Sequence, residues 1–296
     1  MILADSLSTD RTVEIARLLP IQIVQLKQPG DRRCGAAAQL GYQFARGAFI
    51  LLVDADMELQ RGFVAAALAE LAADPRLAAV GGQQIEMSES LEYQERQRRG
   101  RRTPGPALSI GGSAMYRASA VREAGYFMNR NLHCAEEFEL AARLRARGWR
   151  LRMLACDAFR HHGHTDPAIG LLFRRWRTRF FTGYGAMLRG AWRKPHFADA
   201  VRVCAIPLAT VGWWMLLAVL AAASVFDRRI GLVLMTVAVM PLAALVIRKR
   251  SLSRALHALT LWQFHAAALL QGLCARQAEP TQPIAASVVQ ERRQLV

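Results

Sequence analysis

Two carboxylates stand one residue apart at the end of an apolar run, where FILLVDADMEL places Asp54 and Asp56 after residues 49–53. Side chains at positions i and i+2 of an extended chain point to the same side, so both carboxylates can face one ligand. Hard divalent cations take carboxylate ligands and bridge phosphate oxygens, which suits chemistry on a phosphate-bearing substrate. The structural alternative is a pair of aspartates that form a turn.

Three further segments carry side chains that could bind or react. Asp5 opens the turn DSLSTD, and the paired glycines Gly111 and Gly112 open GGSAMYR. A second acidic pair, Glu136 and Glu137, opens the predicted helix EEFELAARLRAR. Structural explanations exist for each: turn aspartates accept hydrogen bonds from backbone N–H groups, and acids in a first helical turn complement the helix dipole. Paired glycines form tight turns, but they also let a backbone approach a ligand closely.

The elements that must position these residues alternate between strands and helices. Strands are predicted for MILA, IQIVQLK, LAAVGGQQ and FILLVDAD, and the last is apolar enough for burial on both faces, as in a parallel sheet covered by helices. Helices are predicted for TVEIARLL, CGAAAQLGYQFARG and RGFVAAALAELAAD. This alternation is typical of a doubly wound α/β domain, in which ligands bind beyond the carboxyl ends of strands. Asp54 and Asp56 lie at one such end.

Four motifs follow one another along residues 1–165: DSLSTDRT, CGAAAQLGYQFARGAFILLVDADMEL, GGSAMYRASAVREAGYF and AEEFELAARLRARGWRL. Their order and spacing resemble the family 2 glycosyltransferases of the GT-A fold. The resemblance implies a Rossmann-like catalytic domain with a mostly parallel sheet, followed by C-terminal transmembrane helices. It further implies an inverting transfer of a sugar from a nucleotide-sugar donor to a lipid or membrane-proximal acceptor, assisted by Mn²⁺ or Mg²⁺.

The family's donor-site residues fall on matching positions of this sequence. The resemblance gives Asp5 a hydrogen bond to a uracil-type base, which favours a UDP-sugar. Gly111 and Gly112 are expected to form the floor beneath the sugar and the acceptor. The family's Asp-x-Asp motif corresponds to Asp54, which faces the ribose or the metal, and to Asp56, which binds the metal directly.

The base and the third metal ligand are each left with more than one candidate. The resemblance makes Glu137 the general base that removes the acceptor hydroxyl proton, in a position where the family more often has aspartate, and Glu136 is the second candidate. The extra methylene matters because proton transfer needs a reach of about 2.6–3.2 Å. A histidine after the acidic helix often completes the metal shell of such enzymes, so the third ligand is expected among His161, His162 and His164.

Two uncharged runs follow the catalytic region, residues 203–226 and 230–247, and each has about the 20 apolar residues that cross a bilayer core. Lysine and arginine are dense before the first run and after the second, and only Arg228 and Arg229 stand between them. The positive-inside rule therefore predicts a multi-pass protein of the inner membrane with its catalytic domain on the cytoplasmic face. A third segment, residues 256–275, either spans the membrane or lies in its interface.

This organisation divides the chain into a glycosyltransferase domain (1–165), a basic and aromatic interface segment (166–202), membrane helices (203–275) and a cytoplasmic tail (276–296). The formal charge of +16 is assigned to contact with anionic lipid and not to nucleic acid, because the interleaved aromatic residues of a stacking platform are missing. The five cysteines include no Cys-x-x-Cys pair, so neither a zinc ribbon nor a disulfide framework is indicated.

One family feature has no counterpart in this sequence. Members begin with an apolar strand at the centre of the sheet, and this sequence begins at the position of the second strand. We expect the lack of that strand to leave unpaired backbone on both of its neighbours, unless an upstream segment or another part of the chain takes its place. The alternative to an active enzyme is therefore a non-catalytic or truncated nucleotide-sugar-binding membrane protein.

Overall fold

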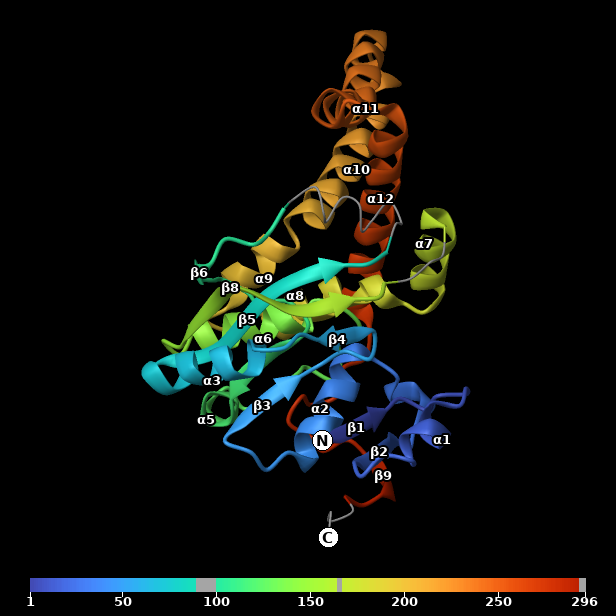
Figure 1. The fold of residues 1–296 in the computed structure, drawn as a ribbon. Coiled ribbons are helices and arrows are strands. Elements are labelled where there is room, and N and C mark those ends of the chain that lie inside the picture. The colour runs from blue at the N-terminus through green and yellow to red at the C-terminus, as the bar shows by residue number, and fades with distance from the viewer. Residues whose placement is uncertain (89–99, 164–166, 293–296) are drawn as a thin grey trace.

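The computed structural model describes residues 1–88, 100–163 and 167–292. Within these residues the strands form two sheets, and a column of long helices projects away from them (Figure 1). The smaller sheet has the order β1 (Ile2–Asp5), β2 (Gln22–Leu26), β9 (Ala286–Gln290). The larger sheet has the order β3 (Phe49–Leu52), β7 (Ala114–Arg117), β5 (Leu77–Glu86), β8 (Arg150–His161), β4 (Met57–Leu59), with β6 (Gly105–Pro106) paired to β8.

The sheets are mixed, which corrects the expectation of a mostly parallel sheet. In the described residues β1 runs parallel to β2, and β5 runs parallel to β8. The other pairs are antiparallel: β9 on β2, β7 on both β3 and β5, and both β4 and β6 on β8. In the larger sheet the cause is β7, which enters between β3 and β5 and runs against both.

The strand β3 is half-buried along its whole length, whereas the sequence predicted burial on both faces. Among the described strands only β7 pairs with β3, so β3 ends the larger sheet. The strand β1 likewise ends the smaller sheet, and β9 joins the far side of β2. In the described part of the chain, β9 therefore does not fill a place between β1 and β3, and both of these remain edge strands.

The helix α2 (Cys34–Phe44) joins the two sheets through different faces. Ala36 and Leu40, one helical turn apart, pack into the core of the smaller sheet. Ala38 and Tyr42 pack against the core of the larger sheet. Apolar contacts on two sides of one helix therefore hold the sheets in a single domain.

Helices cover both faces of the larger sheet. The helix α3 (Phe63–Ala73) packs on one face, and α5 (Ala118–Glu123) and α6 (Glu136–Arg145) pack on the other. Adjacent residues of β5 serve opposite cores, Ala79 on the α5 and α6 side and Val80 on the α3 side, as the pleat of a strand requires. This layered domain positions the candidate site residues.

Shorter helices link this domain to the helical column: α7 (Ala168–Arg177), η2 (Phe180–Thr182), α8 (Gly183–Gly190) and α9 (Phe197–Val203). The short helix α1 (Thr12–Ala16) packs on the smaller sheet through Ala16, and the short helix η1 (Pro29–Asp31) follows β2 in the chain. The helix α12 (Leu252–Cys274) crosses α8 closely, because Gly185 and Gly272 leave room for the backbone of the opposing segment. Small residues at this crossing fix the column to the domain.

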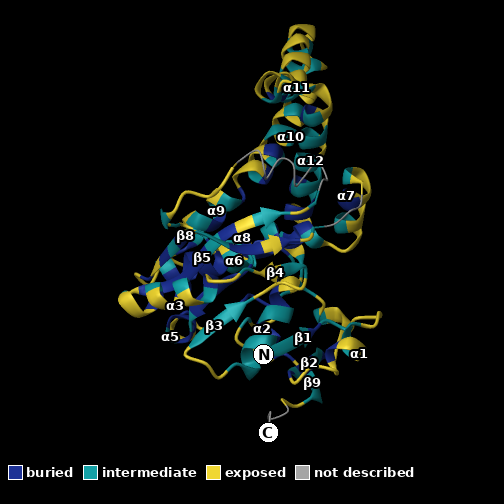
Figure 2. Cartoon of the chain, viewed as in Figure 1, coloured by how far each residue is buried: buried dark blue, intermediate teal, exposed yellow. Residues whose placement is uncertain are grey.

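The helices α10 (Ala205–Ser224) and α11 (Arg228–Lys249) are long and apolar enough to cross a membrane, by length and composition. Only 11% of the most apolar stretch of α10 and 6% of that of α11 are buried. Figure 2 shows mostly half-buried and exposed residues along this column. Trp214 of α10 donates from Nε1 to Gln263 Oε1 of α12 at 2.7 Å, which ties these two helices together.

Residues 276–290 pack on the N-terminal domain, which corrects the expectation that this part of the chain is only a tail. Asn131 Nδ2 donates to the Ala278 carbonyl oxygen at 2.9 Å, and the Ala278 N–H donates to Asn131 Oδ1 at 2.8 Å. Gln43 makes the same pair of bonds with the backbone of Ile284, and β9 then pairs with β2. The side-chain amides of Asn131 and Gln43 thus satisfy backbone groups of the C-terminal segment. Because these hydrogen bonds belong to neither a helix nor a strand, no sequence pattern predicted them.

A substitution at Gly35 can test the packing at the start of α2. Its N–H donates to the Leu132 carbonyl oxygen at 3.1 Å, and a Cβ there would overlap the Asn129 carbonyl oxygen. We expect Gly35→Ala to lower the free energy of unfolding by about 1–3 kcal/mol, because backbone atoms must shift. Thermal unfolding measures the loss, with Gly30→Ala as control, since a Cβ at Gly30 meets nothing within 4 Å among the described residues. Equal melting temperatures for the two variants would contradict this packing.

Candidate functional site

Asp54 and Asp56 lie in the short connection between β3 and β4. The Asp54 N–H donates to Ser113 Oγ at 3.0 Å, and the Met57 N–H donates to the Asp54 carbonyl oxygen at 3.0 Å. The chain therefore turns at once into β4, which pairs with the end of β8 so that Met57 stands opposite His161. This pairing brings the Asp-x-Asp segment beside a histidine that is far away in the sequence.

Gly112 lies between two of the predicted carboxylates. A Cβ on this glycine would stand 2.5 Å from Asp54 Oδ2 and 3.4 Å from Glu137 Oε1. Three segments therefore meet at Gly112: the Asp-x-Asp connection, the glycine pair and the start of the acidic helix. The sequence alone could treat them only separately.

The acidic pair begins α6 after Ala135, whose backbone is left-handed with φ of 64°. The Glu136 Oε2 atom is buried and has no hydrogen-bond partner within the described residues. Desolvation raises the pKa of Glu136 well above its usual range, and the charges of Glu137 and Asp54 raise it further. Glu136 is therefore the member of this group that retains a proton most readily.

His161 stands between two carboxylates. Its Nε2 lies 3.2 Å from Asp56 Oδ2, and its Nδ1 lies 2.6 Å from Glu86 Oε2. Desolvation lowers the pKa of His161, but the hydrogen bonds to Asp56 and Glu86 outweigh it and raise the pKa to about 9. The pKa of Asp54 is raised by desolvation and by Asp56, against a lowering by His161. Because Glu86 holds Nδ1, the Nε2 atom faces the Asp-x-Asp segment.

The other two candidate histidines have different positions. The His162 N–H donates to the Asp56 carbonyl oxygen at 2.8 Å, but its side chain is exposed, with Nε2 3.5 Å from Glu58 Oε2. His164 lies outside the described residues. Of the two histidines that the structure describes in this segment, only His161 directs its ring to the Asp56 carboxylate.

The chemistry of Asp56 and His161 fits a divalent cation, since Mn²⁺ and Mg²⁺ accept carboxylate oxygens and Mn²⁺ also accepts imidazole nitrogen. Over the described ranges of the chain, no group of three or more His, Cys, Asp or Glu side chains is arranged to hold a metal ion by itself. Asp56 and His161 could supply two ligands. A cation held in this way would keep water and take its remaining ligands from substrate phosphates.

Asp5 belongs to the smaller sheet, at the end of β1. Its buried carboxylate accepts the Ser8 N–H at 3.1 Å and Gln25 Nε2 at 2.7 Å. Desolvation raises the pKa of Asp5, but these hydrogen bonds give a net lowering. The contacts are those of a turn aspartate, and they do not join Asp5 to the carboxylates at Gly112.

Three contributors to the site were not identified from the sequence: Ser113, Glu86 and Arg102. The Arg102 guanidinium donates to the Ile110 carbonyl oxygen beside Gly111, whose backbone has φ of 96°. Desolvation lowers the pKa of Arg102 and the charge of Glu137 raises it, so a cation lies near the acidic pair. Glu86 follows the predicted strand LAAVGGQQ by two residues, which was a usable signal, whereas Arg102 ends an arginine-rich run whose role the sequence did not fix.

Comparisons with known proteins bear on the fold. Residues 1–130 match the family model described as Glycosyl transferase family 2. A search of curated proteins found no match. Among solved structures, the mannosyltransferase PcManGT from Pyrobaculum calidifontis, in complex with GDP-Man and Mn²⁺, is 19% identical with a TM-score of 0.58, and the alignment covers 92% of this chain and 77% of that one.

Two further structures are more distant. S. aureus TarS 1-349 in complex with UDP-GlcNAc is 13% identical with a TM-score of 0.45, covering 91% of this chain and 81% of that one. GalNAc-T7 with UDP, GalNAc and Mn²⁺ is 14% identical with a TM-score of 0.45, covering 60% and 44%. The chain spans 38% of a longer TarS structure. The likeness to PcManGT shows a shared fold.

Glu136 gives the site a pH dependence that unfolding can measure. Its folded pKa is raised above the unfolded value, so folding binds a proton and stability falls as pH rises from the unfolded pKa towards the folded one. We expect Glu136→Gln to flatten this fall, which has a slope of at most about 1.4 kcal/mol per pH unit. Chemical unfolding between pH 5 and 8 measures it, with Glu58→Gln as an exposed control. Parallel profiles for wild type and Glu136→Gln would refute the assignment of the proton.

Proposed function

We propose that this chain is a metal-assisted inverting glycosyltransferase that transfers a sugar from a nucleotide-sugar donor to an acceptor at a membrane surface. Its residues 1–130 match the model of glycosyl transferase family 2. The observation that carries the proposal is the meeting of Asp54 and Glu137 at Gly112, with Asp56 and His161 adjacent. A site for a phosphate-bound cation and a site for a proton acceptor then border the same space.

On the donor side, Asp56 and His161 would hold Mn²⁺ or Mg²⁺, and Asp54 would face the ribose or the same cation. When bound, the cation neutralises the charge that develops on the departing nucleoside diphosphate. Glu86 orients His161 for this task through its 2.6 Å contact with Nδ1. PcManGT, which shares the fold, is in complex with GDP-Man and Mn²⁺, a donor and cation of the classes proposed here.

Asp5 is the proposed contact to the donor base. Its carboxylate already accepts bonds from Ser8 and Gln25, but two carboxylate oxygens offer about four lone-pair positions, so it can accept an imide N–H as well. A uracil-type base carries such a donor, and a UDP-sugar is therefore the donor we favour. Gly111 and Gly112 are assigned to the floor beneath the sugar.

Glu137 is the proposed general base. Burial first, and then the neighbouring charges, raise the pKa of Glu136, which makes it the member of the pair that retains a proton more readily, so we assign Glu137 as the carboxylate that accepts one. In a single displacement the acceptor oxygen attacks the anomeric carbon as the bond to the diphosphate breaks. The electron pair leaves with the diphosphate, the hydroxyl proton passes to Glu137, and the anomeric configuration inverts.

The membrane part of the proposal rests on α10 and α11, whose apolar residues are exposed to the surroundings and not packed in a core. Cys204 at the start of α10 and Leu269 near the end of α12 share one buried cluster on the domain, so the column leaves and returns on one side. This supports residues 203–275 as membrane helices, with residues 166–202 at the interface. The catalytic domain, residues 1–165, then lies on the cytoplasmic face of the inner membrane, beside a lipid or membrane-proximal acceptor.

A second candidate is a non-catalytic nucleotide-sugar-binding protein. It is favoured by the edge strands β1 and β3, which leave the two sheets unconnected by hydrogen bonds within the described residues. The two candidates differ in one result, because only the enzyme releases nucleoside diphosphate from a bound donor.

Asp56→Asn tests the donor side. The amide keeps the shape of the side chain but loses its charge, so Mn²⁺-dependent binding of UDP-sugars should weaken. The loss should exceed the about 10–100-fold that typically follows removal of a group hydrogen-bonded to a metal ligand. Calorimetric titration with Mn²⁺, and again with a chelator, measures this, and the exposed Glu58→Gln serves as control. Unchanged Mn²⁺-dependent affinity in Asp56→Asn would remove the metal assignment.

Glu137→Gln and Glu136→Gln together test the base. Turnover in Glu137→Gln should fall by about 10²–10⁴-fold with donor affinity unchanged, since a general base contributes to this extent. Glu136→Gln should lose far less, because an amide resembles the protonated carboxyl that it replaces. Release of nucleoside diphosphate under saturating donor measures both, and a larger loss in Glu136→Gln would reverse the assignment.

A further inference from the structure

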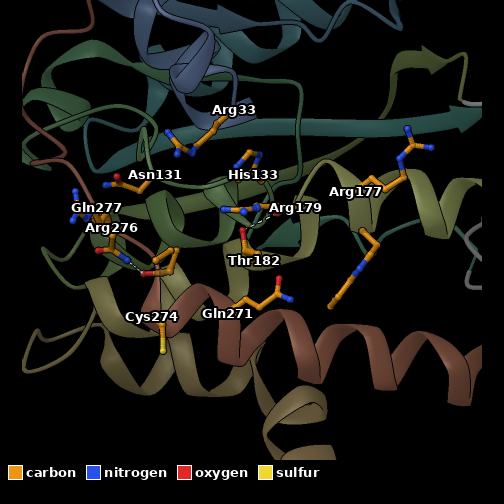
Figure 3. A pocket seen from close by; sticks show the side chains of 13 residues that line it. Arg33, Asn131, His133, Arg177, Arg179, Thr182, Gln271, Cys274, Arg276 and Gln277 are labelled. Carbon is orange, nitrogen blue, oxygen red and sulfur yellow. Dashed lines mark hydrogen bonds between the residues drawn. The ribbon is translucent and has the colours of Figure 1, made fainter.

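A cavity of about 600 Å³ lies where four parts of the chain meet (Figure 3). Its walls come from the residue before α2, from the segment that precedes the acidic helix, from the α7–η2 connection and from the end of α12. The cavity is separate from Asp54, Asp56 and His161, none of which lines it.

The lining of this cavity is strongly cationic. It includes Arg33, Arg177, Arg179 and Arg276, and among the described residues no aspartate or glutamate lines it. Arg33 reaches Asp31 only at 4.0 Å. For the other three, no ion pair with a carboxylate occurs within the described part of the chain. The positive charge of this cavity is therefore largely uncompensated.

Neighbouring groups respond to this charge. Desolvation lowers the pKa of Arg33; Asp31 raises it, and Arg130 and Arg179 lower it again. Desolvation, followed by Arg33 and Arg179, lowers the pKa of His133 to about 4. His133 is thus neutral at physiological pH and adds a hydrogen-bonding ring without further repulsion. An anion would relieve the repulsion between the guanidinium groups.

Figure 3 shows Arg33, His133 and Arg179 directed towards a common space from three different elements. Arg179 has left-handed backbone with φ of 57°, a conformation that a non-glycine residue adopts only when its surroundings impose it. Guanidinium groups that converge in this way match phosphate oxygens, to which arginine donates two parallel hydrogen bonds. The volume of about 600 Å³ admits a phosphate or diphosphate group.

The position of the cavity indicates what carries that phosphate. On one side, His133 lies in the segment that leads into α6, four residues before the proposed base Glu137. On the other side, Trp176 lines the cavity and packs edge-on against Phe264 of α12, with ring centroids 5.3 Å apart. An anion held here has an acidic reaction site on one side and an aromatic, apolar helix on the other.

We propose that this cavity binds the phosphate or diphosphate group of an amphipathic acceptor, whose apolar chain lies along α7 and α12. The role of the bound molecule as sugar acceptor rests on the proposed function. The binding of a lipid-linked phosphate in this cavity does not. The same chemistry could also serve a soluble phosphate, so the test separates the two sources.

The experiment uses the full chain and three probes below any micelle concentration: decyl phosphate, decanol and inorganic pyrophosphate. Calorimetric titration should show decyl phosphate bound at least tenfold more tightly than decanol or pyrophosphate. Arg179→Gln should weaken decyl phosphate binding at least tenfold and leave UDP-sugar binding unchanged. Arg17→Gln removes an exposed arginine outside the cavity and should bind like wild type.

Should Arg179→Gln unfold early in a thermal scan, Arg276→Gln tests the opposite wall of the same cavity. Wild-type affinity for decyl phosphate in the folded cavity variant would overturn the proposal. Pyrophosphate bound as tightly as decyl phosphate would overturn the lipid source and identify a site for soluble phosphate. If decyl phosphate binds as expected but no sugar is transferred, the proposed function fails and the phosphate site stands. If sugar is transferred but binding of decyl phosphate does not depend on the arginines, the proposed function stands and the phosphate site fails.

Discussion

The crowding of carboxylates around Gly112 is the constraint on which the rest of the site depends. Asp54 and Glu137 approach the same glycine, and a Cβ there would press on both. Desolvation, and then the charges of Glu137 and Asp54, raise the pKa of Glu136, whose Oε2 has no hydrogen-bond partner in the described residues. A protein keeps such an arrangement at a cost in stability, and the cost is understandable where cations and protons are exchanged with a substrate.

The fold serves this arrangement by joining distant segments. The β4–β8 pairing sets His161 beside Asp56, and the helix α2 holds the two sheets together through Ala36 and Leu40 on one side and Ala38 and Tyr42 on the other. The C-terminal segment returns to the domain and adds β9 to β2. The chain therefore enters and leaves the column of α10, α11 and α12 at the domain that carries the site. The proposed cavity for the acceptor phosphate has walls from the domain and from the column.

Local patterns predicted the elements well, and pairing partners poorly. Cys34–Phe44 and Glu136–Arg145 form helices almost as their composition indicated, and the strand before Asp54 ends one residue before its apolar run does. The direction of β7 was not predictable, because it depends on where the chain re-enters the sheet after β6. Glu86 and Ser113 were missed for a related reason: each acts through a hydrogen bond to a residue far away in the chain. Asp5 lies in the smaller sheet, apart from the other carboxylates, a placement that no local pattern indicated.

The central claim is that the carboxylates at Gly112 perform a single displacement at the anomeric carbon of a nucleotide-sugar. The most direct measurement is the anomeric configuration of the transferred sugar, read by NMR coupling constants on the first product formed by the full chain with Mn²⁺. The account predicts a configuration opposite to that of the donor. A retained configuration would contradict it, because Glu137 as sole base in one displacement cannot produce that outcome.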